Sequence, residues 1–113
     1  MNKFFGFLVI TLIFASCSQY QKAINSDDIA LKSELANKMY EEGKYAKAIR
    51  LYEQIVPSYK GKPNAERLFF LYSNSLYKTK QYYLAGYQFE NFAANYPKSE
   101  KREEATFLGA ECY

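Results

Sequence analysis

The sequence predicts an all-α chain of helix-turn-helix repeats, because it matches itself at an offset of 37 residues and places small residues where paired helices would cross. Seven pairs match without a gap: Ala36 with Ser73, Asn37 with Asn74, Met39 with Leu76, Tyr40 with Tyr77, Tyr45 with Tyr82, Ala48 with Ala85, and Tyr52 with Phe89. A fixed period of this length is typical of stacked helical units. Each copy is therefore expected to bury its apolar face against its neighbour.

The punctuation of the chain places the helices. We expect four of them at about 28–42, 45–59, 63–79 and 81–96, and a fifth that begins at Glu100. Asp27 or Asp28 can cap the first helix, and Pro63 fits the first turn of the third, where its missing N–H costs nothing. Pro97 ends the fourth helix and Ser99 can cap the fifth.

Small side chains should decide how closely the paired helices approach. Ala36 and Ala48 in the first copy, like Ser73 and Ala85 in the second, let two backbones come together while aromatic rings fill the seams on either side.

The fifth helix would open a further repeat. Ala105, Leu108, Gly109 and Cys112 fit the first half of the pattern, so residues 28–113 divide into repeats at about 28–62, 63–98 and, in part, 99–113. A half-repeat leaves an apolar stripe uncovered. Either the sequence is part of a longer protein, which we favour, or this helix packs on a partner.

The first residues read as a signal peptide. Lys3 precedes the apolar stretch Phe4–Ala15, whose twelve residues are too few for a membrane span, since one needs about 20. The exit Phe14-Ala15-Ser16-Cys17 resembles the lipobox of bacterial lipoproteins. That resemblance implies cleavage after residue 16, diacylation of Cys17 and attachment to a membrane. Ser18 is not the Asp that favours inner-membrane retention, so the outer membrane, on its periplasmic face, is expected. Residues 17–27 would form the lipidated N-terminus and a polar tether.

Composition excludes several classes of function. The net charge is only +3 and basic and acidic residues interleave, so no nucleic-acid footprint is present. The chain has no histidine, and Cys112 is the one thiol left once Cys17 carries lipid, which argues against a metal site. We expect no catalytic residues, no cofactor and no small-molecule substrate, hence no enzyme.

The repeat pattern resembles the tetratricopeptide repeat, a helix-turn-helix of 34 residues. Gly43, Tyr45, Ala48 and Tyr52 fill its positions in the first copy; Tyr82, Ala85, Phe89 and Pro97 do so in the second, where Lys80 replaces the turn glycine. The resemblance implies two full repeats plus the first helix of a third, after a lipoprotein signal peptide.

First helices of such repeats line a concave groove that binds peptides. Asn37 and Tyr40, repeated as Asn74 and Tyr77, share a helical face and are the candidate peptide-binding residues, although they could equally be solvated amides and packing rings. Arg67 is the only basic side chain placed in the groove, which argues against a carboxylate clamp and favours apolar or aromatic segments.

Together the lipobox, the repeats, the segment Phe92–Ser99 and the segment Glu104–Ala110 resemble the outer membrane protein assembly factor BamD family. This implies a lipid-anchored, non-enzymatic subunit of the machinery that inserts β-barrel proteins into the outer membrane. Its expected partners are β-barrel assembly subunits and unfolded outer-membrane protein segments. The alternative is another periplasmic repeat scaffold, for cell-wall coordination or secretion.

Overall fold

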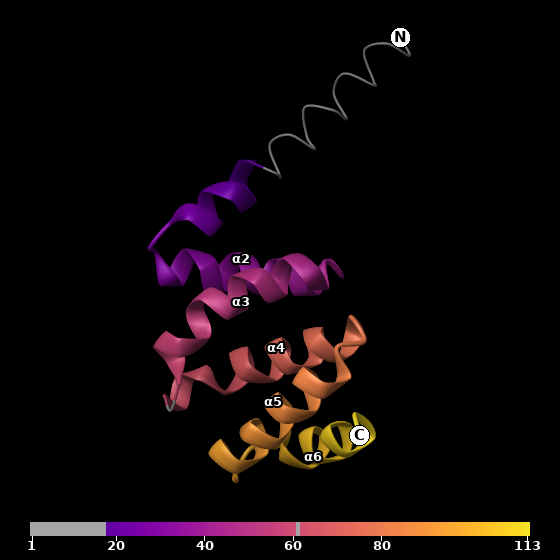
Figure 1. The fold of residues 1–113 in the computed structure, drawn as a ribbon. Helices are drawn as coiled ribbons and strands as arrows, with labels where there is room; N and C mark the ends of the chain where they lie inside the picture. Colours follow the sequence, from indigo (N-terminus) through magenta and orange to yellow (C-terminus); the bar gives the residue numbers. More distant parts are fainter. Residues whose placement is uncertain (1–17, 61) are drawn as a thin grey trace.

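The computed structural model describes residues 18–60 and 62–113, and this part of the chain is helical without any strand. The signal peptide expected over residues 1–16 and the lipidation expected at Cys17 lie outside it. After a helical segment at 18–25, the elements are α2 (Ile29–Glu41), α3 (Tyr45–Tyr59), the 3₁₀ turn η1 (Pro63–Ala65), α4 (Glu66–Lys78), α5 (Tyr82–Asn95) and α6 (Arg102–Glu111) (Figure 1).

The helices expected from the sequence are confirmed with small shifts at their ends. Asp28 caps α2, its carboxylate accepting a hydrogen bond of 3.2 Å from the Leu31 amide. The third expected helix begins as η1 with Pro63 in its first turn and continues as α4. Helices α2 and α3 form a first pair and α4 and α5 a second pair.

Residues 18–25 form a helix, which corrects the tether expected over residues 17–27. Tyr20 and Ala23 are buried in the core, and Ile24 packs against it. These residues are spaced i, i+3 and i+4, so they make one apolar face that the surrounding polar residues disguise. The Lys47 ammonium lies 5.3 Å from the centroid of the Tyr20 ring, which adds a cation–π contact between this segment and α3.

The two turns within the pairs have the same backbone geometry. Gly43 has φ +78° and Lys80, 37 residues later, has φ +64°. The Lys44 amide donates to the Met39 carbonyl at 2.8 Å, and the Gln81 amide donates to the Leu76 carbonyl at 2.9 Å. Both turns are Schellman motifs, which require a left-handed residue after the helix.

The interior of the two pairs is also repeated. Ala48 and Ala85 are completely buried, as are Tyr52 and Phe89 seven half-turns of sequence apart in the pattern, which confirms the expected close crossings and filled seams. An edge-to-face ring pair recurs as well: Tyr40 with Tyr45 at 5.4 Å and Tyr77 with Tyr82 at 5.7 Å between centroids.

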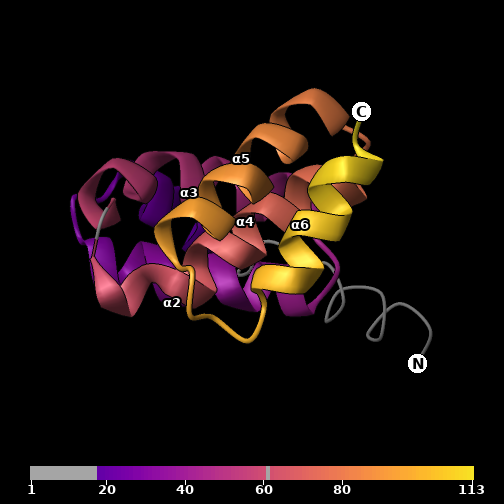
Figure 2. The same ribbon diagram turned by 90° about the horizontal axis from the view of Figure 1, so that it is seen from below.

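The helices stack from α2 to α6, and a view from below shows α3 and α5 on one side of the stack with α2 and α4 on the other (Figure 2). Helix α6 packs on α5 at two glycines. A Cβ atom on Gly109 would come within 3.2 Å of the Phe89 Cβ, so the backbones meet more closely than an alanine allows. None of the helices in the described residues is long and apolar enough to cross a bilayer.

Candidate functional site

Polar side chains link the first helices of successive repeats. The Asn74 amide on α4 donates to the Tyr40 hydroxyl on α2 at 2.6 Å. One repeat later, the Tyr77 hydroxyl donates to the Glu111 carboxylate on α6 at 3.4 Å. Because Glu111 lies 37 residues after Asn74, these are the same contact made twice, with a carboxylate in place of an amide. The negative charge of Glu111 raises the pKa of the Tyr77 hydroxyl above its ordinary value.

Asn37 is turned toward the second helix of its own pair. The hydroxyl of the fully buried Tyr52 on α3 donates to the Asn37 side-chain oxygen at 2.8 Å. Burial raises the pKa of Tyr52 strongly, since the charged phenolate would lose its hydration there. This bond satisfies a hydroxyl that would otherwise be buried without a partner.

The structure therefore brings the four sequence-predicted residues into helix-to-helix hydrogen bonds. Tyr40 and Asn74 contact each other, whereas Asn37 and Tyr77 bond to side chains outside the predicted set. A peptide could still contact Tyr40, which borders the hollow described next, but Asn37 already has its main acceptor engaged. Their role as peptide ligands stays a prediction.

A hollow of about 600 Å³ lies between the first helices, at the junction of the two pairs. Its floor is apolar, made by Phe70 and Leu71 of α4 and Phe92 of α5. The remaining lining residues are Tyr40, Pro63, Asn64, Glu66, Arg67 and Lys101. We call this the junction groove. An aromatic floor with polar groups at its edge suits an apolar or aromatic side chain.

Two cations stand at the edge of the junction groove. A guanidinium nitrogen of Arg67 lies 3.6 Å from the Glu41 carboxylate. The Lys101 ammonium lies 5.3 Å from the centroid of the Phe70 ring and 3.3 Å from the Glu104 carboxylate. These ion pairs are exposed to solvent, so each holds its cation weakly, by about 1 kcal/mol or less. Either cation could exchange its partner for a ligand carboxylate.

Lys101 corrects the expectation that Arg67 is the only basic residue of the groove. It lies just before α6, as the N-cap residue, so its sequence position is outside the helices that were expected to line the surface. The fold brings it over Phe70 because the connection after α5 returns to the first-helix side. A signal was present in the sequence only as the basic pair Lys101-Arg102 at the start of a repeat.

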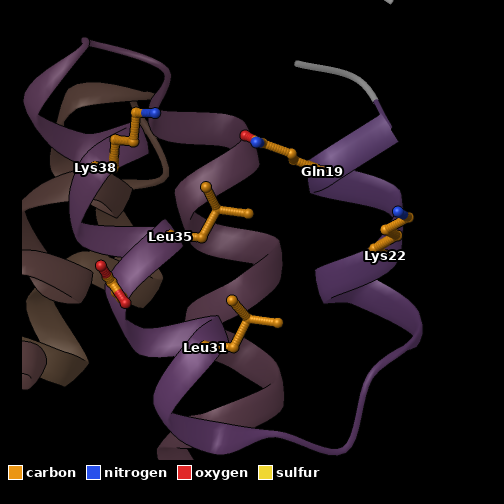
Figure 3. A pocket seen from close by; sticks show the side chains of 6 residues that line it. Gln19, Lys22, Leu31, Leu35 and Lys38 are labelled. Atoms are coloured by element: carbon orange, nitrogen blue, oxygen red, sulfur yellow. The ribbon is translucent and has the colours of Figure 1, made fainter. Parts of the chain in front are cut away.

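A second hollow, of about 310 Å³, lies between residues 18–25 and α2. Figure 3 shows Leu31 and Leu35 pointing from α2 toward the N-terminal segment, with Gln19 reaching back across the gap. None of the four predicted residues borders it. It follows from the packing of the N-terminal helix rather than from the repeat.

Comparison with known proteins finds no matching family model, no matching curated protein and no matching solved structure. Among residues 18–60 and 62–113, no group of three or more His, Cys, Asp or Glu side chains is placed to hold a metal ion. The junction groove is therefore assessed from its own geometry.

Proposed function

We propose that this chain is a lipid-anchored, non-enzymatic subunit of the outer-membrane β-barrel assembly machinery, built from tetratricopeptide-type repeats, that binds unfolded precursor segments in the junction groove. The observation that carries the proposal is the combination of an aromatic floor, Phe70 and Phe92, with the cations Arg67 and Lys101 at one edge. A chain end that consists of an aromatic residue and its free carboxylate has the matching chemistry.

The polar links between the first helices support a preformed groove. The contacts of Tyr40 with Asn74 and of Tyr77 with Glu111 hold successive first helices in fixed register, so a peptide would find the surface already ordered. Preorganisation lowers the entropy that binding must overcome.

The groove is tested with a fluorescent peptide that ends in phenylalanine, supplied as the free acid and as the amide. The double variant Arg67→Gln, Lys101→Gln should bind the acid about tenfold more weakly, because two exposed ion pairs together contribute roughly 1–1.5 kcal/mol. The amide should bind both proteins equally weakly. Lys47→Gln with Arg50→Gln, on the outer side of α3, is the matched control and should leave affinity unchanged.

Equal affinity for acid and amide would refute the cation part of the proposal. Photo-crosslinks from Tyr83 on α5 in place of Tyr40 would refute the groove itself. Membership in the assembly machinery is tested separately: the lipidated chain should copurify with a large β-barrel protein from outer membranes, whereas copurification with cell-wall enzymes would favour the alternative scaffold.

A further inference from the structure

Helix α6 repeats the sequence of α4 but leaves its aromatic residue uncovered. Phe107 lies 37 residues after Phe70, and each is followed by leucine. Phe70 is 8% exposed, whereas Phe107 is 62% exposed. The two copies therefore differ in what packs against them.

The second pair shows what covers such a residue. The rings of Phe89 and Phe92 on α5 lie 5.9 and 5.5 Å from the Phe70 ring, both edge to face. One turn after Phe92, Tyr96 stacks at 6.3 Å on Phe69, and its hydroxyl donates to the Lys62 carbonyl at 3.0 Å. The cover is thus a helix with Phe and Tyr four residues apart.

The corresponding place beside α6 is hollow. A depression of about 660 Å³ has Ser99, Glu103, Thr106 and Phe107 in its wall, which we call the α6 socket. Each of these lies 37 residues after a residue at the Phe92–Tyr96 contact: Lys62, Glu66, Phe69 and Phe70.

The backbone of the socket is already in the receiving geometry. The Ser99 amide donates to the Tyr96 carbonyl at 3.0 Å, just as the Lys62 amide donates to the Tyr59 carbonyl at 3.0 Å. The Arg102 amide then donates to the Ser99 carbonyl, as the Ala65 amide does to that of Lys62, both at 3.2 Å. The Ser99 carbonyl is therefore the counterpart of the one that accepts from Tyr96, and a carbonyl oxygen has a second lone pair to offer.

We propose that the α6 socket binds an amphipathic helix of a partner protein that carries Phe and Tyr four residues apart. The phenylalanine packs on Phe107, and the tyrosine hydroxyl donates to the Ser99 carbonyl. The helix runs antiparallel to α6, as α5 does to α4. This inference rests on the internal repeat and is independent of the function proposed for the junction groove.

A second copy of the chain is a poorer occupant. Its own Phe92 and Tyr96 are engaged in the second pair. Its exposed pair with the same spacing, Tyr83 and Tyr87 on α5, would dock head to tail and generate an open-ended assembly. A partner helix closes the contact without this consequence.

The probe is a synthetic peptide with the sequence of residues 82–98, held helical by a staple that joins positions 90 and 94, both of which face solvent on α5. A staple is needed because a helix this short is marginal in water. Added to the mature chain, it should bind saturably and shift the NMR signals of Phe107 and Ser99.

Phe107→Ser in the protein and Phe92→Ser in the peptide should each weaken binding at least tenfold, and Tyr96→Phe in the peptide about fivefold. Tyr83→Ser in the protein is the control and should change nothing. Circular dichroism establishes that the variants remain helical. Absence of saturable binding, or binding that survives Phe107→Ser, would overturn the proposal. Self-association of the chain that Tyr83→Ser abolishes would assign the socket to a second copy and would also overturn it.

Discussion

The first and second helical pairs share their interiors and differ on their outer surfaces. The turns, the buried alanines and the edge-to-face tyrosine pairs recur at 37 residues. On the outer side, α3 presents Ala46, Lys47 and Arg50, beside which Tyr20 and Gln21 of the N-terminal helix lie. The same positions on α5 are Tyr83, Leu84 and Tyr87, and all three are exposed.

This difference separates what the repeat requires from what each copy is free to change. Buried positions must fill fixed spaces, so both pairs use residues of similar size there. Outer positions meet different neighbours, so they diverge. The following experiments test whether the boundary between the two sets lies where the structure places it.

Truncation of the shared interior should have the largest effect. Phe89→Ala in the second pair and Tyr52→Ala in the first should each lower the free energy of unfolding by about 3–5 kcal/mol, because each empties a fully buried site. Tyr83→Ala, on the exposed side of α5, should change it by less than about 0.5 kcal/mol. Urea denaturation measures all three. A large loss in Tyr83→Ala would show that the outer face of the second pair is packed.

Removal of one hydroxyl should make the first pair resemble the second. Tyr52→Phe deletes the bond to Asn37 and should cost about 0.5–1.5 kcal/mol at neutral pH.

The same variant should resist alkali better. Burial raises the folded-state pKa of Tyr52 above its ordinary value of 10.0, so the folded state keeps this proton after the unfolded state begins to release it. The stability that Tyr52 contributes is complete below pH 10 and is lost as the pH rises above it. Wild-type stability should therefore fall above about pH 10 more steeply than that of Tyr52→Phe. Parallel curves would mean that Tyr52 ionises equally in both states.

Exchange of the two turn residues should have the smallest effect. Lys80→Gly should stabilise the protein by about 1 kcal/mol, since glycine adopts positive φ without strain. Gly43→Ala should destabilise it by a similar amount, and through the backbone alone, because an added Cβ would have no atom within 4 Å. Thermal melts of the two variants and of their combination, in which the effects should cancel, measure this. A destabilised Lys80→Gly would show that the lysine side chain contributes more than its backbone strain costs.

Periodicity predicted the fold well because it reports burial. Residues such as Ala48 and Phe89 match their counterparts for packing reasons, so helix positions, turn positions and the core followed from the sequence alone. The predicted groove residues were found on the first helices, but their hydrogen-bond partners were not foreseen. A helical face can be inferred from spacing, whereas the bond from Asn74 to Tyr40 depends on how two separate helices are placed.

Two parts of the structure escaped prediction for related reasons. The N-terminal helix hides three apolar residues among polar ones, and its burial depends on α2 and α3, which are distant in sequence. Lys101 reaches the junction groove by way of a connection rather than a helix. In both cases tertiary contacts decide the outcome, and no local pattern encodes them.

The N-terminal helix also determines how an anchored chain would move. An extended tether of ten residues would let the repeats explore a hemisphere of about 35 Å radius around the lipid. The packed helix 18–25 leaves no such leash, since its eight residues rise only about 12 Å and are fixed to the core. A chain acylated at Cys17 would then present its groove at a nearly constant height and tilt above the bilayer. Encounters with neighbours in the membrane would become a search in two dimensions between surfaces that already face each other.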